Sequence, residues 1–302
     1  MPYIQYKDIR FKSKSKIAIR QAQEICNEYA EKGYTLTLRQ LYYQFVARGY
    51  LENSQKSYDN LGNLISDARL AGLLDWDIIE DRTRDITGLP TWDNPKDILQ
   101  SSARQFKYDF WADQSVRIQV WVEKEALAGV IERIAFKHRC EYFSCRGYAS
   151  QSALWRAGQQ FQDYHSAGQP IKIIHLGDHD PSGIDMTRDN RERVEMFSEW
   201  ADVEVIRIAL NMDQVEEYKP PPNPAKQTDR RYEGYAAKYG DESWELDALP
   251  PDVLDKLISD EIEEYIDWDK WNAVKEREDE AKIRLDEISK NYKTYDDYLR
   301  DA

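Results

Sequence analysis

One stretch constrains the fold more than any other. Residues 171–183 read Ile-Lys-Ile-Ile-His-Leu-Gly-Asp-His-Asp-Pro-Ser-Gly, an apolar run that ends abruptly in two aspartates. Such a run is typical of a strand buried in a parallel sheet. Asp178 and Asp180 would share one face of a regular strand, and Pro181 and Gly183 would then turn the chain. A second apolar run, 120–122, ends in Glu123. Because open α/β sheets bind ligands at the carboxyl ends of their strands, we expect these acids to meet at one edge.

The three carboxylates predict a metal site. Hard oxygen ligands without nearby Cys or His suit Mg²⁺, which keeps several waters and needs few carboxylates. The alternative is an ordinary acidic loop at the end of a parallel strand. Glu123 favours the metal, because three acids from two strands repel one another unless a cation lies between them.

From residue 117 onward the pattern alternates between strands and helices. We expect strands at 118–122, 142–145, 171–176 and 203–210, with helices at 126–137, 150–164 and 184–200. This order predicts an α/β domain with a mostly parallel four-stranded sheet between helices. Arg146 and Gly147 follow the second strand and would bring a cation to the same edge; the alternative is a simple turn.

The N-terminal part predicts three helices, at 16–32, 38–48 and 57–70, followed by a hairpin-like piece at 73–84. Thr37 and Gln40 have the spacing of a capping box at the second helix. Three helices and a hairpin match a helix-turn-helix domain with a wing, and an unspecialised three-helix unit is the alternative. In the first case the candidate DNA contacts are Lys56, Asn60, Asn63, Arg69, Arg82, Arg84 and, from the second domain, Arg146.

Tyr43 stands beside the buried stripe of the second helix, one turn after Arg39. A guanidinium within reach of a phenol could stabilise a phenolate, or a phosphate bonded to that oxygen. A boundary tyrosine packed under an arginine stem is the alternative reading of these two residues.

Composition and charge set the remaining limits. Gly88, Pro90 and Pro95 predict a linker, so we expect domains at 1–94 and 95–220, with a Pro-rich loop and an acidic helical extension at 221–302. Most of the net charge of −14 belongs to this last part, and the first part begins with a basic cluster. Local field steers a polyanion, so the total charge leaves DNA binding open.

The three cysteines show neither metal spacing nor a disulfide framework, which predicts a reducing, cytoplasmic compartment. No apolar run approaches membrane-spanning length and no signal peptide is expected. We therefore predict no membrane partner.

Taken together, several motifs resemble one family. Val122-Glu123-Lys, Cys145-Arg-Gly147-Tyr148 and Gly177-Asp178-His-Asp180-Pro-Ser-Gly183 resemble the Toprim domain of the topoisomerase VI A subunit and of its relatives that make meiotic DNA breaks. Thr37-Leu-Arg39-Gln-Leu-Tyr42-Tyr43 is similar to the winged-helix tyrosine motif of that family. The short length resembles stand-alone, mini-A-like members from phages and bacteria. Ala149-Ser150 departs from the Pro-Asp common in the family.

The resemblance implies a Mg²⁺-dependent, DNA-cleaving topoisomerase-like transesterase. It makes Tyr43 the nucleophile, Arg39 its phosphate-side helper, and Glu123, Asp178 and Asp180 the metal ligands. It also implies a homodimer in which the tyrosine of one chain meets the metal site of the other, a nucleoid location when bound to DNA, and an ATPase B-type subunit as a further partner. The short N-terminus weighs against that subunit. A Toprim nuclease that uses water is the alternative enzyme, and a DNA-binding protein with a silent acidic site is the third reading.

Overall fold

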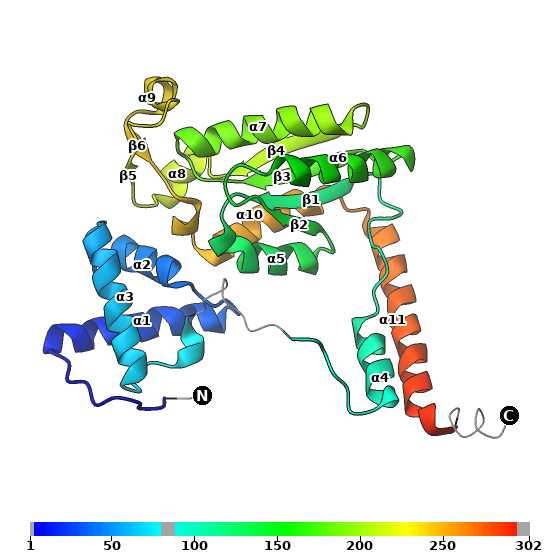
Figure 1. Cartoon of the computed structure of the whole chain (residues 1–302), viewed down its shortest axis with the longest axis horizontal. Helices are drawn as coiled ribbons and strands as arrows, with labels where there is room; N and C mark the ends of the chain where they lie inside the picture. The colour runs from blue at the N-terminus through cyan, green and yellow to red at the C-terminus, as the bar shows by residue number, and fades with distance from the viewer. Residues whose placement is uncertain (1–2, 80–87, 295–302) are drawn as a thin grey trace.

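The computed structural model describes residues 3–79 and 88–294 of this α/β chain (Figure 1). Its N-terminal unit contains the three predicted helices, α1 (Ser13–Glu31), α2 (Leu38–Ala47) and α3 (Gln55–Leu70). Both hydrogen bonds of the predicted capping box between Thr37 and Gln40 are present, which fixes where α2 begins. The apolar faces of the three helices share one small core.

The predicted wing is wrong where it can be compared. Residues 73–79 contain a 3₁₀ helix, η1 (Trp76–Ile78), and Ile79 forms one isolated parallel bridge with Leu36. The Asp75 carboxylate accepts a hydrogen bond from the Asp77 N–H, and this local turn replaces a strand. The rest of the predicted hairpin, with Arg82 and Arg84, lies outside the described residues.

The second part confirms the predicted parallel sheet. Its strands β1 (Arg117–Val122), β2 (Glu141–Ser144), β3 (Ile171–Leu176) and β4 (Val203–Ala209) pair in the order β2-β1-β3-β4, all parallel. The two inner strands, β1 and β3, are almost wholly buried, and this is why both appear in the sequence as continuous apolar runs.

Helices cover both faces of the sheet (Figure 1). On one face lie α6 (Gln151–Ser166) and α7 (Pro181–Ser198), whose core includes Trp121, Phe161 and Val194. On the other lie α5 (Ala128–Lys137), preceded by η2 (Glu125–Leu127), and α10 (Pro251–Glu263). Helix α7 begins three residues earlier than predicted. Pro181 suits the first helical position and Asp180 caps it, so the expected turn is a helix start.

The C-terminal part belongs to the same core as the sheet. After α8 (Met212–Tyr218), the Pro-rich stretch forms β5 (Asn223–Pro224), which pairs antiparallel with β6 (Glu242–Ser243) beyond α9 (Tyr232–Tyr239). Then η3 (Leu246–Ala248) leads into α10. Leu246, Leu254 and Trp271 pack in one cluster with residues of β1 and β3. The boundary predicted at residue 220 therefore separates segments that share one core.

Two helices stand beside the sheet domain (Figure 1). Helix α4 (Pro95–Gln105) packs along α11 (Trp268–Lys290). Helix α11 belongs to the acidic extension predicted at 221–302, and its Glu278 is buried. That carboxylate accepts from the Tyr108 N–H and pairs with Arg139.

The N-terminal unit docks onto residues 245–255 of the sheet domain. Lys32 pairs with Asp252 at 2.8 Å, and the Tyr34 hydroxyl donates to Asp255 at 2.7 Å. Ala248 of η3 lies in the core of the N-terminal unit. These contacts bring α2 to the carboxyl edge of the sheet. Within the described residues, the helices are all too short or too polar to cross a lipid bilayer.

Candidate functional site

A cavity of about 410 Å³ lies where α2 meets the carboxyl edge of the sheet. Arg39 and Tyr43 line it from α2, and Asp178 and Asp180 line it from the segment after β3. Its other walls come from the start of α3 and from the β5–β6 ladder, including Tyr58, Asn223 and Glu245. The cavity therefore brings together residues of α2 and residues that follow β3, which lie far apart in the sequence.

Tyr43 is buried, with 3% of its surface exposed. The expectation that it lies off the buried face of α2 is therefore wrong. The reason is tertiary: η3 covers the side of α2 that the helix pattern alone assigns to solvent. Burial, followed by the nearby Asp247 and Glu245, raises the pKa of the Tyr43 phenol, while Arg39 and a hydrogen bond with Asn223 act in the opposite direction. The phenol is protonated at neutral pH.

Arg39 lies beside Tyr43 as the helical spacing predicts, but acids already hold its guanidinium. Its Nη2 is 3.2 Å from Glu245, and its Nε is 3.4 Å from Asp247. The Arg39 side chain is nearly half exposed, so it remains accessible from the cavity. Arg39 therefore links α2 to the η3 segment.

The three predicted metal ligands are neighbours. The Glu123 carboxylate accepts from the Asp178 N–H at 3.0 Å, and both side chains are buried. Asp180 does not share a strand face with Asp178, because β3 ends at Leu176 and the Asp180 Oδ1 caps α7 by accepting from Gly183. Burial, then Asp178 and Asp180, raises the pKa of Glu123 to about 7, and burial raises that of Asp178 to about 6 although Lys124 opposes it.

Two glycines allow this close approach. A Cβ on Gly177 would lie 2.8 Å from the Glu123 Oε2, and one on Gly183 would lie 2.2 Å from the Asp178 carbonyl oxygen. At Gly183 the obstructing atom is backbone, so only glycine fits there, whereas a Cβ at Gly177 would displace the Glu123 carboxylate at the end of its side chain.

The donor chemistry fits Mg²⁺ in part. Three carboxylates gather at the sheet edge, and crowding of like charges there raises the pKa of Glu123. Yet among residues 3–79 and 88–294 no three His, Cys, Asp or Glu side chains converge as a ready cage. Mg²⁺ is commonly held by one or two carboxylates, with waters and substrate phosphates completing its shell. Asp178 and Asp180 line the cavity and would be the direct ligands, with Glu123 adjoining them.

Lys124 supplies the positive charge in the present arrangement. Its Nζ lies 3.1 Å from Asp178, 2.7 Å from Glu245 and 3.1 Å from Asp247. Burial alone would lower the pKa of Lys124, but Asp247, Asp178 and Glu245 raise it, so the ammonium keeps its charge. The ion pairs therefore form one connected network. Arg39 and Lys124 both pair with Glu245 and Asp247, and Lys124 also pairs with Asp178.

Arg207 holds the backbone that carries the aspartates. From β4 its guanidinium donates to the carbonyl oxygens of Gly177 at 3.0 Å, Asp178 at 2.7 Å and Gly183 at 3.0 Å. Three carbonyls around one planar cation fix both the end of β3 and the start of α7.

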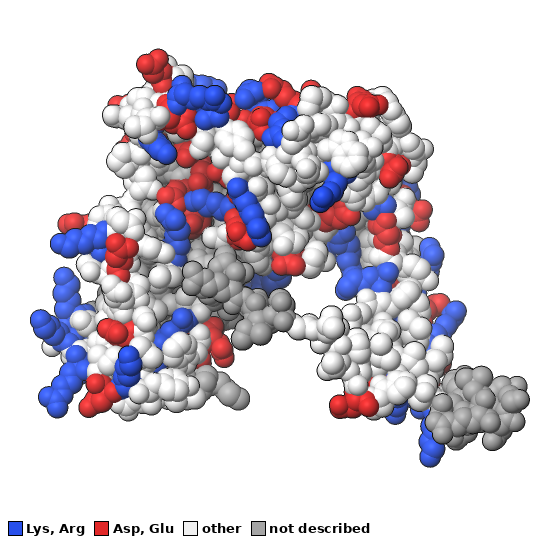
Figure 2. All heavy atoms as spheres, in the orientation of Figure 1, with Lys and Arg blue, Asp and Glu red and all other residues white. Residues whose placement is uncertain are grey.

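The predicted DNA contacts divide into two groups. Lys56, Asn60 and Asn63 are exposed on α3. Arg69 instead donates to the carbonyl oxygens of Trp76 and Ile79, so it ties η1 to α3. Arg146 is mostly exposed and pairs with Glu125 at 2.5 Å. Basic side chains project from the end of the molecule where α1 begins, and both signs of charge meet where the N-terminal unit touches the sheet domain (Figure 2).

The sequence reasoning missed five residues of this site, namely Lys124, Arg207, Asn223, Glu245 and Asp247. Lys124 had a signal, because it follows Glu123 directly. Glu245 and Asp247 had none, since they lie among many acids of the C-terminal part.

Comparison with protein-family models, curated protein sequences and solved structures found no match.

Proposed function

We propose that this chain cleaves DNA by transesterification, with Tyr43 as the nucleophile and the acidic edge of the sheet as the Mg²⁺ site. The observation that carries the proposal is the shared cavity. The Tyr43 phenol, the Arg39 guanidinium and two aspartates from distant parts of the chain face the same space, which Tyr42 and Tyr58 also line. In the proposed transesterification these groups supply the nucleophile, a cation beside the phosphate oxygens and a site for the metal.

In the proposed step the Tyr43 oxygen forms a bond to phosphorus, and the bond from phosphorus to one sugar oxygen breaks. In net terms the phenol proton ends on that departing oxygen, which leaves as a hydroxyl. The link is a phosphodiester again, so reversal can reseal the strand. When bound, Mg²⁺ would neutralise charge on the phosphate oxygens.

The chain's own residues prepare this step. Arg39 is placed to bind a phosphate oxygen once it leaves Glu245, because a guanidinium matches phosphate geometry. An added cation near Tyr43 lowers the pKa of the phenol, which burial and two acids raise in the free protein. Arg207 keeps the Asp178 backbone in place throughout.

We infer that DNA lies across the cavity with the exposed face of α3 and the basic start of α1 beside it. Lys56, Asn60 and Asn63 would meet the duplex there. A break in both strands takes two tyrosines, so we propose a homodimer as the acting species. An ATPase partner subunit stays a prediction.

The test is to incubate supercoiled plasmid with the chain and Mg²⁺, stop with detergent, and assay for protein joined to DNA ends. Tyr43→Phe should abolish the adduct. Tyr58→Phe is the matched control, because Tyr58 lines the same cavity and should keep it. Adducts at wild-type level in Tyr43→Phe would refute the assignment.

A metal-dependent nuclease that uses water is the second candidate. The burial of Tyr43 and the raised pKa of its phenol favour it, because both make the phenol a poorer nucleophile. It predicts Mg²⁺-dependent breaks without attached protein, so electrophoresis with and without protease separates the two candidates. Cleavage that survives Tyr43→Phe and is lost in Asp178→Asn would assign the nuclease.

A further inference from the structure

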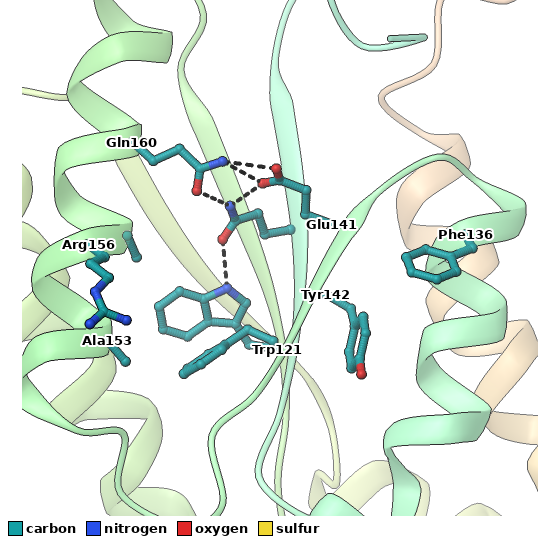
Figure 3. Close-up of a pocket in the computed structure, with 10 residues that line it drawn as sticks. Trp121, Phe136, Glu141, Tyr142, Ala153, Arg156 and Gln160 are labelled. Carbon is teal, nitrogen blue, oxygen red and sulfur yellow. Dashed lines mark hydrogen bonds between the residues drawn. The ribbon is translucent and has the colours of Figure 1, made fainter. Parts of the chain in front are cut away.

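The outer edge of the sheet holds a groove of about 440 Å³ that shares no lining residue with the cavity at Tyr43. Strand β2 forms its floor. Phe136 of α5 stands on one side, and Arg156 and Gln160 of α6 stand on the other (Figure 3). We call this the edge groove.

The floor of the edge groove offers free backbone groups. Strand β2 is at the end of the strand order and pairs only with β1. The Cys145 N–H donates to Val122 of β1, and residues of a strand alternate in direction, so Tyr142 and Ser144 turn their N–H and C=O groups outward. Outside the sheet ladder, no backbone hydrogen bond to these groups is found among the described residues.

The walls of the edge groove are aromatic. Phe136 packs edge-on against Tyr142 at 6.0 Å between ring centroids, and Trp121 packs against Phe143 at 5.0 Å. Phe136 is 56% exposed although it is a large apolar side chain. Apolar rings beside an open strand edge are the features that recognise an added strand, whose alternate side chains enter the pockets.

Of the two charged side chains that line the edge groove, Glu141 is hydrogen-bonded within the described residues and Arg156 is not. Glu141 is satisfied, because Gln119 and Gln160 donate to its carboxylate (Figure 3). Arg156 is exposed and, within the described part of the chain, has no hydrogen bond or ion pair. The groove therefore has one unpaired cation and no unpaired acid among its lining residues.

We propose that the edge groove binds an extended, largely apolar peptide segment of another protein, which adds a strand beside β2 and presents an acid to Arg156. The open backbone supplies the hydrogen bonds, and Phe136, Tyr142 and Phe143 receive the apolar side chains. A single strand fits better than a second copy of this chain. A facing groove would offer Arg156 no acid, because Glu141, the acid that lines the groove, is already held by Gln119 and Gln160.

The probe is a phage-displayed library of random peptides, selected on the purified full chain. The most enriched peptide is then made with a fluorescein label, and its binding is measured by anisotropy. Enriched peptides should alternate apolar residues and carry an acid. Arg156→Glu should weaken binding at least tenfold, and a peptide whose acid is changed to lysine should bind Arg156→Glu better than it binds wild type.

Ser144→Pro removes an outward N–H without touching the β1 ladder, so it should also weaken binding. Arg104→Glu, on the exposed surface of α4, is the matched control and should leave binding unchanged. The proposal is overturned if no peptide is enriched, or if the enriched peptides bind Arg156→Glu and Ser144→Pro as tightly as wild type. It is also overturned if sedimentation shows a dimer that both variants dissociate, since the groove would then hold a second copy.

Discussion

The Nζ of Lys124 lies 3.1 Å from the Oδ2 of Asp178, so a side chain of this protein places positive charge where we propose that Mg²⁺ is attracted. The same ammonium also pairs with Glu245 and Asp247. Binding of a metal and a phosphate would therefore require these ion pairs to rearrange. The first two predictions test the two sides of this network.

Lys124→Met should destabilise the metal-free protein. Removing one partner of a buried ion pair leaves acids without their counter-charge, which costs about 3 kcal/mol where they stay ionised. We expect about 2 kcal/mol at pH 8, because Asp178 relieves part of the cost by taking up a proton. Addition of Mg²⁺ should then raise the melting temperature of Lys124→Met more than that of wild type.

The control for this measurement is Lys137→Met. Its ion pair with Asp255 is at the surface, and exposed pairs contribute about 0–1 kcal/mol. If Lys124→Met unfolds at the same denaturant concentration as Lys137→Met, the ammonium does not balance the acidic cluster.

Glu245→Gln should strengthen DNA binding. Glu245 pairs with both Arg39 and Lys124, and its loss leaves each cation with fewer acidic partners and therefore more available to a phosphate. Each added phosphate contact steepens the dependence of log affinity on log salt by about 0.9. Anisotropy of a labelled duplex at several salt concentrations measures this slope. Glu242→Gln changes the net charge equally and lies on the neighbouring β6. An equal effect of Glu242→Gln would mean that the stronger binding comes from the change in net charge and not from Arg39 and Lys124.

The pH dependence of metal binding follows from the raised pKa values. Mg²⁺ needs ionised carboxylates, while the metal-free Glu123 and Asp178 have pKa values of about 7 and about 6. We expect Mg²⁺ affinity to fall at least about tenfold between pH 8 and pH 6. Titration calorimetry at both pH values measures it, and equal affinities would contradict the assignment of these acids.

The stability of the metal-free protein should change with pH in the opposite direction. The pKa of Glu123 is higher in the folded chain than in the unfolded chain, so between pH 4.5 and about 7 the folded state holds the extra proton. The free energy of unfolding therefore falls as pH rises through this window. Glu123→Gln should flatten that part of the curve, by on the order of 1 to 3 kcal/mol at pH 8.

The sequence predicted those elements of the fold that a local residue pattern determines. The runs ending at Val122 and Leu176 fixed two inner strands, and Thr37 with Gln40 fixed the start of α2. The burial of Tyr43 was not predictable, because the η3 segment that covers it lies some 200 residues further along the chain and has no periodic signal. For the same reason the partners of Lys124 and Arg39 appeared only in the structure. A helix pattern describes one element, whereas this site is made by contacts between elements.

The last prediction concerns which chain supplies each group. The resemblance to topoisomerase VI implies that the tyrosine of one chain acts with the metal site of another, whereas one cavity of a single chain contains Tyr43, Asp178 and Asp180. We expect action within one chain. Tyr43→Phe and Asp180→Asn chains should each form no DNA adduct, and their mixture should stay inactive after subunit exchange. Asn caps helices about as well as Asp, so Asp180→Asn should preserve the start of α7. Adducts appearing only in the mixture would show that the tyrosine and the acids act across two chains.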